Sequence, residues 1–203
     1  MNILLGLTGS VATIKAGELY TELSKNDEVK VVATEKAMHF LPNPIECAKN
    51  NKPYIPLYKI ITEEQEWNWK KLGDPVQHIE LAEWADILLV APITANTISK
   101  LSNGICDNLL TCIFVAWNQK KPIIIAPAMN TRMWEHYIIQ ENLSNLFANY
   151  VQNYFCDIIE PIKKKLACGT VGVGAMAEIS TIIKHVEHAK TWVNESAIKE
   201  IIE

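Results

Sequence analysis

The chain has 203 residues, of which 49% are hydrophobic, and 19 basic against 23 acidic side chains give it a formal net charge of −4. This length and apolar content suffice for one domain with an ordinary hydrophobic core. The acidic balance, without a long basic run, argues against nucleic acid as the main partner, and no stretch approaches the roughly 18 apolar residues of a membrane span.

The start of the chain and its cysteines bear on the cellular compartment. Met1–Gly6 lacks the charged and long apolar regions of a secretion signal and is typical of a first strand. The cysteines are odd in number and form no CxxC pair, so neither a disulfide framework nor a zinc site is expected. We therefore expect a reducing, cytoplasmic setting.

Short apolar runs alternate with amphipathic stretches, which is typical of βαβ units around a parallel sheet. Because the runs are nearly continuous, the strands are expected to be covered on both faces. The expected strands are Ile3–Leu7, Val29–Ala33, Ile87–Ala91, Ile123–Ala126 and a weaker one at Tyr154–Ile159. The expected helices are Val11–Leu23, Lys36–Leu41, Thr94–Leu101, Asn108–Trp117, Met133–Ala148 and Ile179–Val193. The sequence predicts a single α/β domain over residues 1–203.

The segment Gly6–Ala12 joins the first expected strand to the first expected helix. Its glycines permit a tight turn, and the free N–H groups of a helix N-terminus, with the Ser10 hydroxyl, attract a phosphate. The segment is neither a Walker loop nor GxGxxG, and Ser10 is equally well explained as a simple N-cap. Thr34, after the second strand, either faces the same crevice or caps the next helix.

The stretch Pro42–Pro75 interrupts the alternation of strands and helices. It is rich in proline and contains the charged run Glu63–Lys71, in which Trp67 and Trp69 stand. We expect a long excursion beside the sheet. Its tryptophans either form a lid or a subunit contact, or they cover the core from outside.

The segment Ala91–Thr97 follows the third expected strand. Pro92 ends that strand, and Thr94 or Asn96 can cap the following helix. The side chains of Thr94, Asn96 and Thr97 also offer hydrogen-bond donors and acceptors at the carboxyl edge of the sheet. A planar heteroaromatic ring would use such groups.

The next segment, Asn103–Thr111, contains two expected helix boundaries. Gly104 is predicted to end one helix, and Asp107 is predicted to be the N-cap of the next. For Asp107 and Asn108, capping is favoured over a direct role in chemistry.

Two further segments do not look like ordinary core. Pro127–Asn130 places an amide side chain just past the carboxyl end of a buried strand, where open α/β sheets bind ligands. Leu166–Glu178 places Cys168 in a flexible, glycine-rich loop that could close over that ligand. Together, Asn130 and Cys168 predict chemistry on a small molecule.

The spacing of the histidines does not predict a metal site. His185 and His188 share a helix at i, i+3, but no carboxylate or cysteine pattern accompanies them, so they are interpreted as solvated surface. On its own, His78 would be interpreted as a core or helix-start residue.

Several motifs in the same order resemble those of the flavoprotein cysteine decarboxylases: Thr94–Thr97, Asn103–Thr111, Pro127–Asn130 and Cys168–Glu178. With the Gly6–Ala12 segment, the resemblance covers nearly the whole chain. It implies a flavodoxin-like or Rossmann-like three-layer α/β sandwich. It also implies a homotrimer that binds FMN near its subunit interfaces.

The resemblance assigns a role to individual residues. FMN phosphate would be held by Gly9, Ser10 and Val11 with Thr34 beside them, and the flavin would be contacted by Phe40, Thr94, Ala95, Asn96, Thr97 and Ala128. The catalytic residues would be His78, Asn130 and Cys168, and the substrate would also contact Lys165, Ala167 and Met176.

The implied reaction is the FMN-dependent decarboxylation of 4'-phosphopantothenoyl-L-cysteine to 4'-phosphopantetheine in coenzyme A synthesis. A cysteine carboxylate lacks an electron sink, so FMN would create one by oxidising the carbon that bears sulfur. His78 would act as the base, because imidazole titrates near neutral pH. Asn130 would hold the carboxylate without neutralising it, and Cys168 would supply the final proton.

The chain departs from the family pattern at three positions. Thr170 stands where many relatives carry an acidic residue, Lys165 where many carry Arg, and Thr94 where Ser is more frequent. Lys165 keeps the charge but loses the planar fork that binds phosphate or carboxylate in two places.

Two other functions within this fold stay open at this stage. One is decarboxylation of a C-terminal peptidyl cysteine, although relatives of that type usually have Pro-Asn-Met-Asn in place of Pro127–Asn130. The other is a non-catalytic, phosphatase-regulating subunit. Such subunits carry long acidic tails and often lack a catalytic residue, whereas His78 and Asn130 are present here.

Overall fold

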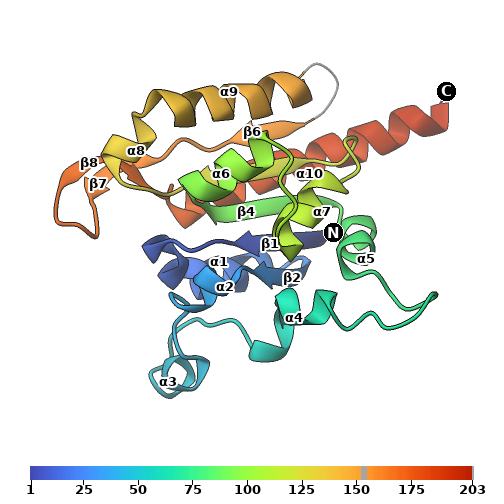
Figure 1. The fold of residues 1–203 in the computed structure, drawn as a ribbon, viewed down its shortest axis with the longest axis horizontal. Coiled ribbons are helices and arrows are strands. Elements are labelled where there is room, and N and C mark those ends of the chain that lie inside the picture. The colour runs from blue at the N-terminus through green and yellow to red at the C-terminus, as the bar shows by residue number, and fades with distance from the viewer. Residues whose placement is uncertain (152–154, 203) are drawn as a thin grey trace.

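The computed structural model describes residues 1–151 and 155–202. Its central sheet contains β1 (Asn2–Leu7), β2 (Glu28–Ala33), β3 (Ile60–Ile61), β4 (Ile87–Ile93), β5 (Ile123–Pro127) and β6 (Cys156–Ile158). These strands lie in the order β3-β2-β1-β4-β5-β6, and all neighbours are parallel (Figure 1). The order reverses between β1 and β4, which is the point where such sheets open a crevice for ligands.

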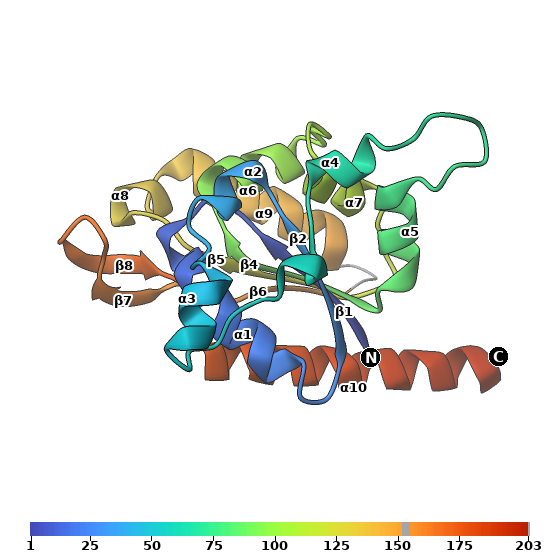
Figure 2. The ribbon, with the colours of Figure 1, turned by 90° about the horizontal axis from the view of Figure 1, so that it is seen from below.

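Helices cover both faces of this sheet. One face packs against α1 (Ala16–Leu23) and α10 (Ile179–Ile202). The other face packs against α5 (Gln77–Trp84), α6 (Ala95–Ser102), α7 (Leu109–Val115) and α9 (Tyr137–Val151). Figure 2 shows α1 and α10 below the sheet and α6, α7 and α9 above it. The expected α/β three-layer sandwich with a parallel sheet is confirmed.

Strand β1 shows why both layers form. Ile3, Leu5 and Leu7 pack on the α1 and α10 side, Leu4 packs on the other side, and all four are fully buried. Each such side chain stabilises the fold by about 1.5–3 kcal/mol through removal of apolar surface from water. Because the pattern leaves no polar face, the strand needs cover on both sides.

Short elements complete the chain. They are the 3-10 helices η1 (Val11–Lys15) and η2 (Leu57–Lys59), the helices α2 (Glu35–Met38), α3 (Pro44–Lys49), α4 (Glu63–Glu66) and α8 (Thr131–Trp134), and the antiparallel strands β7 (Ile162–Lys165) and β8 (Val171–Ala175). Within the described residues, no helix combines the length and apolarity needed to cross a bilayer.

Every expected strand and helix overlaps an observed one, but several details differ. The first expected helix begins as η1, and Met133–Ala148 is divided between α8 and α9. Tyr154, the start of the last expected strand, lies outside the described residues. Helix α5 was not predicted. Within the loop expected at Leu166–Glu178, Cys168 does lie in a turn, but Val171–Ala175 is a strand that pairs with β7 in a hairpin.

The excursion Pro42–Pro75 holds α3, η2, β3 and α4. Trp67 and Trp69 leave 77% and 49% of their surface exposed. The interpretation that these tryptophans cover the core is therefore wrong.

Candidate active site

A cavity of about 550 Å³ opens where β1 and β5 end, beside the β7–β8 hairpin. Its volume lies within the range of ordinary small-molecule sites. It is lined by Ser10, Val11, Ala12, Ile14, Lys15, Ala128, Met129, Asn130, Lys164, Lys165, Leu166, Ala167, Cys168, Gly174, Ala175 and Met176. Three separate parts of the chain therefore meet at the carboxyl edge of the sheet.

Ser10 joins two walls of the cavity. Its Oγ accepts a hydrogen bond from the backbone N of Ala12 at 3.3 Å, and it donates to the carbonyl oxygen of Ala128 at 3.4 Å. Ser10 is thus the N-cap of η1, as one interpretation of its sequence position predicts. The capping contact fixes the first turn of η1 against the segment that follows β5.

Thr8 is a structural residue of this edge that the sequence did not single out. Its Oγ1 donates to the carbonyl oxygen of Pro92 at 2.9 Å and accepts from the backbone N of Thr94 at 3.0 Å. The side chain is 1% exposed. Thr8 therefore ties the ends of β1 and β4 together where the strand order reverses. Its place in the Gly6–Ala12 motif was the signal that could have found it.

Asn130 and Cys168 meet across the cavity mouth. Asn130 caps α8, because its Oδ1 accepts from the backbone N of Arg132 at 2.9 Å. Its Nδ2 then faces the hairpin and donates to the Sγ of Cys168 at 3.2 Å. The two residues that the sequence selected are brought into direct contact.

The Cys168 thiol is exposed and has a second polar neighbour. Its Sγ lies 3.0 Å from the Oγ1 of Thr170. Hydrogen bonds from the Thr170 hydroxyl and backbone, and then from Asn130, lower the pKa of Cys168 below its ordinary value. Burial has the opposite effect on Cys112 and Cys156, whose pKa values it raises to about 11 and about 12. Cys168 thus differs chemically from these two thiols.

Besides the contact of Asn130 with Cys168, two further contacts attach the hairpin to the rest of the molecule. The backbone N of Met129 donates to the carbonyl oxygen of Gly174 at 2.9 Å. Gly174 has φ +154°, and an added Cβ would lie 2.2 Å from the carbonyl oxygen of Met129. In the second contact, the Glu178 carboxylate lies 3.2 Å from Lys15 Nζ and 3.0 Å from Lys164 Nζ. These two lysines lower the pKa of Glu178.

Eight residues assigned by the resemblance line the cavity: Ser10, Val11, Ala128, Asn130, Lys165, Ala167, Cys168 and Met176. Three other residues assigned by the resemblance lie at or near α2, at the same edge of the sheet. Thr34 Oγ1 accepts from the backbone N of Ala37 and caps α2. Gly9 packs against Lys36, since an added Cβ would lie 2.6 Å from the Lys36 Cβ. Phe40 follows α2 and contacts the ring of His39.

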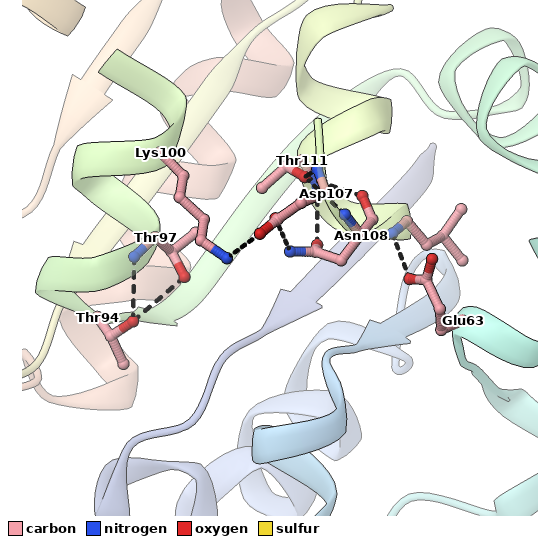
Figure 3. Close-up of polar contacts among 8 residues, drawn as sticks. Glu63, Thr94, Thr97, Lys100, Asp107, Asn108 and Thr111 are labelled. Atoms are coloured by element: carbon pink, nitrogen blue, oxygen red, sulfur yellow. Dashed lines mark hydrogen bonds and ion pairs between the residues drawn. The ribbon is translucent and has the colours of Figure 1, made fainter. Parts of the chain in front are cut away.

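Two sets of polar contacts lie side by side in Figure 3: the Thr94–Thr97 pair at the start of α6, and a network that runs from Lys100 of α6 to Glu63 of α4. Thr94 caps α6 through the backbone N of Thr97, while Ala95 and Thr97 are buried and Asn96 is exposed. Lys100 of the same helix lies 2.5 Å from Asp107 and lowers its pKa. The network consists of Lys100, Asp107, Asn108, Leu109, Thr111 and Glu63.

This network corrects one expectation. Asn108, and not Asp107, is the N-cap of α7, because its Oδ1 accepts from the backbone N of Thr111 at 3.1 Å. Gly104 does follow the end of α6, with φ +66°.

His78 lies apart from the cavity. His78 is the second residue of α5. Helix α5 and the β7–β8 hairpin lie at opposite sides of the molecule in both ribbon views (Figures 1 and 2). Its Nδ1 is 2.5 Å from the Oε1 of Glu66, and 26% of its side chain is exposed. One chain therefore brings Asn130 and Cys168 together but does not bring His78 to them.

The cavity fits a flavin nucleotide. Ile14 and Ala128 offer apolar surface of the kind that a planar ring system requires. Ser10 lies at the same cavity with a hydroxyl that could bind a phosphate, and Lys165 adds positive charge, whereas Lys15 and Lys164 are paired with Glu178. Among the described residues, no group of three or more His, Cys, Asp or Glu side chains is arranged to hold a metal ion.

Comparison with known proteins agrees with this geometry. The model of the family described as Flavoprotein matches residues 1–190. The chain is 46% identical to phosphopantothenoylcysteine decarboxylase HAL3 of Malus domestica, with 91% of this chain and 80% of that protein covered. It is 44% identical to phosphopantothenoylcysteine decarboxylase of Mus musculus, with 91% and 85% covered.

Solved structures are similar over the same extent. A PPC decarboxylase mutant complexed with pantothenoylaminoethenethiol has a TM-score of 0.80 and 43% identity, covering 92% of this chain and 96% of its own. The FMN binding protein AtHal3 has a TM-score of 0.76 and 44% identity, covering 92% and 94%. Peptidyl-cysteine decarboxylase EpiD is more distant, with a TM-score of 0.67 and 26% identity over 90% and 96%.

Proposed function

The chain belongs to the Flavoprotein family, and on that premise we propose that it is an FMN-dependent decarboxylase of 4'-phosphopantothenoyl-L-cysteine. The product is 4'-phosphopantetheine, an intermediate of coenzyme A synthesis. The observation that carries this proposal is the contact of Asn130 with Cys168, 3.2 Å apart at the mouth of a cavity lined by Ser10 and Val11. The similarity to phosphopantothenoylcysteine decarboxylases of plants and mouse supports the substrate.

Each cavity residue has a defined task in this proposal. Ser10 and Val11 bind the phosphate end of FMN, and Ala128 contacts the ring. The bound flavin supplies the electron sink that the cysteine substrate lacks. Lys165, Ala167 and Met176 bind the phosphopantothenoyl arm, which brings the reacting carboxylate to the end of the cavity where Asn130 lies.

Asn130 and Cys168 divide the work on the reacting end of the substrate. The Asn130 amide donates a hydrogen bond to the carboxylate and leaves its negative charge intact, so the carboxylate can depart as carbon dioxide. The Cys168 thiol, whose pKa is lowered, gives its proton to the carbon left behind. His78 takes the proton of the substrate thiol.

The position of His78 supports a proposal for the oligomeric state. Helix α5 and the hairpin lie at opposite sides of one chain, and we propose that the imidazole at each cavity comes from a second subunit. We propose a homotrimer in which His78 of each subunit completes the cavity of its neighbour, since a closed ring repeats one such contact at every interface. We also propose that this assembly is cytoplasmic, a reducing setting in which its five cysteines would stay unpaired.

The test is mass spectrometry of the purified protein incubated separately with phosphopantothenoylcysteine and with a cysteine-ended peptide. We expect yellow protein, release of carbon dioxide from the first substrate and no change in the second. Turnover of the peptide alone would assign the chain to peptidyl-cysteine decarboxylation. Colourless protein that cannot be reconstituted with FMN would overturn the proposal.

A further inference from the structure

The carboxylate of Glu66 holds His78 by two contacts. Glu66 Oε1 lies 2.5 Å from the ring Nδ1, and Glu66 Oε2 accepts a hydrogen bond from the backbone N of His78 at 3.1 Å. Glu66 leaves only 13% of its side chain exposed, and the residue comes from α4, outside the helix that it contacts. Both oxygens of one carboxylate are thus directed at one residue.

This contact determines which ring nitrogen carries the proton. An ionised carboxylate only accepts hydrogen bonds, so the neutral imidazole must present N–H at Nδ1. The proton-free nitrogen is then Nε2, on the opposite edge of the ring. Within the described residues, no hydrogen bond to His78 Nε2 is present. A histidine held in this state offers its free nitrogen to an incoming proton.

Helix α4 is itself fixed, which makes Glu66 a rigid support. Glu63, one turn earlier, accepts from the backbone N of Leu109 at 2.6 Å and from Trp67 Nε1 at 3.0 Å. The first of these contacts ties α4 to the start of α7, at the end of the network in Figure 3. Thr62 and Gln65 form a capping box at the start of α4.

Helix α5 lacks a side-chain cap of its own, since its N-cap position is Val76. The contact of Glu66 with the backbone N of His78 supplies that cap from α4. The helix start and the imidazole are therefore oriented by the same carboxylate.

We infer that Glu66 is the positioning residue of the base: it fixes the proton of His78 on Nδ1 and turns Nε2 outward toward the substrate of a neighbouring subunit. This inference rests on the proposed function for its catalytic consequence. Its structural part, the protonation of one ring nitrogen, needs no substrate and is measured separately.

The test is Glu66→Gln, with Glu64→Gln as the matched control. Gln has nearly the shape of Glu, but an NH₂ group, which donates hydrogen bonds, replaces one of the two carboxylate oxygens. Its oxygen can still accept from the His78 backbone, and its NH₂ then faces Nδ1, which must become the acceptor. The neutral ring moves its proton to Nε2, and the free base is lost. Glu64 lies on the same helix and is exposed, and among the described residues it has no hydrogen bond or ion pair with α5. Its variant therefore removes the same charge without disturbing His78.

Two readouts are combined. Nitrogen-15 NMR of labelled histidine, with the His78 signals identified by their loss in His78→Asn, should show Nδ1–H in wild type and Nε2–H in Glu66→Gln. We expect kcat to fall on the order of 10²-fold in Glu66→Gln with KM within twofold of wild type. In a His78→Asn background, Glu66→Gln should have no further effect, because the two residues act as one unit.

The outcomes separate the two proposals. An unchanged ring tautomer in Glu66→Gln, or full activity of that variant while His78→Asn is inactive, overturns the inference and leaves the proposed function standing. If Glu64→Gln lowers kcat equally, net charge is the cause and the inference is again overturned. A tautomer change in a protein whose wild type does not decarboxylate phosphopantothenoylcysteine supports the role of Glu66 and overturns the proposed function.

Discussion

The hydroxyl of Thr170 is the strongest influence on the acidity of Cys168, ahead of the contact with Asn130. Replacing Thr170 with Val keeps the shape of the side chain but removes this hydrogen bond, so the pKa of Cys168 should rise. Only the thiolate is alkylated. We therefore expect the rate of Cys168 alkylation by iodoacetamide at pH 7 to fall about threefold or more, as measured by mass spectrometry of the peptide.

Two comparisons make this measurement specific. Cys112 and Cys156, with pKa values of about 11 and about 12, should react slowly in every variant. Thr181→Val removes an exposed hydroxyl elsewhere and should leave the rate at Cys168 unchanged. An unaltered rate in Thr170→Val would show that another group controls the thiol.

The sequence predicted some residues of the site from local position alone. Asn130 follows a buried strand and Ser10 precedes a helix, and both therefore lie at the carboxyl edge of the sheet. Glu66 could not be found in this way. It reaches His78 across 12 positions of a proline-rich excursion whose path depends on tertiary contacts.

At the scale of elements, the β7–β8 hairpin depends on the close approach of Gly174 to Met129. Gly174→Ala would place a Cβ 2.2 Å from a backbone oxygen, which cannot move aside without displacing the end of β5. The positive φ of +154° adds strain for any L-residue. We expect the hairpin to separate from Met129 while the sheet stays folded.

Hydrogen exchange resolves this separation. The backbone N–H of Met129, which donates to Gly174, should exchange at least tenfold faster in Gly174→Ala, and KM for the substrate should rise. The amides of β1 and β4 should be unaffected, because both strands lie in the core of the sheet. Protection of Met129 equal to wild type would contradict the proposed attachment.

The salt bridges of Glu178 give the hairpin a dependence on pH. The lysines lower the pKa of Glu178 in the folded protein, so its contribution to stability is present above the ordinary carboxyl value and is lost as pH falls through the lowered one. Wild type should therefore have a higher Tm than Glu178→Gln above about pH 5, and the two should converge in acid. If the difference in Tm between wild type and Glu178→Gln stayed constant down to about pH 2, ionisation of this carboxylate would not be its cause.

Two elements show why local patterns were insufficient. Helix α5 has no capping side chain at Val76, and its cap comes from Glu66. Strand β7 contains three consecutive lysines and lacks the alternation that marks a strand. Its pairing with the glycine-containing β8 depends on contacts with Met129 and on the turn at Gly169, where φ is +85°. Such contacts become visible only in the folded chain.

At the scale of the whole molecule, the parallel sheet covered on both faces and the place of the crevice at its carboxyl edge followed from the sequence. Nearly continuous apolar runs separated by helices allow few other arrangements. The separation of His78 from the cavity did not follow, because motif order says nothing of distance in the fold. The motifs predicted residues of one site, and in the fold Asn130 and Cys168 lie at the cavity while α5, which carries His78, lies at the opposite side.

This distribution predicts complementation between inactive variants. His78→Asn lacks the base but keeps an intact cavity, and Cys168→Ser keeps the base but lacks the proton donor. When equal amounts of the two variants are coexpressed, the proposed trimer has a complete site wherever a Cys168→Ser subunit donates its His78 to a His78→Asn neighbour. Random assembly gives this arrangement in about one quarter of sites, so we expect about one quarter of wild-type activity.

The matched control pairs Asn130→Ala with Cys168→Ser. Both changes lie in the same cavity of the same chain, 3.2 Å apart, so no mixture restores a complete site. If this control were as active as the first mixture, neighbouring subunits would have to share Asn130 or Cys168 as well as His78. If neither mixture is active while each variant is folded and yellow, His78 acts within its own chain, and the rigid separation of α5 from the hairpin does not describe the working enzyme.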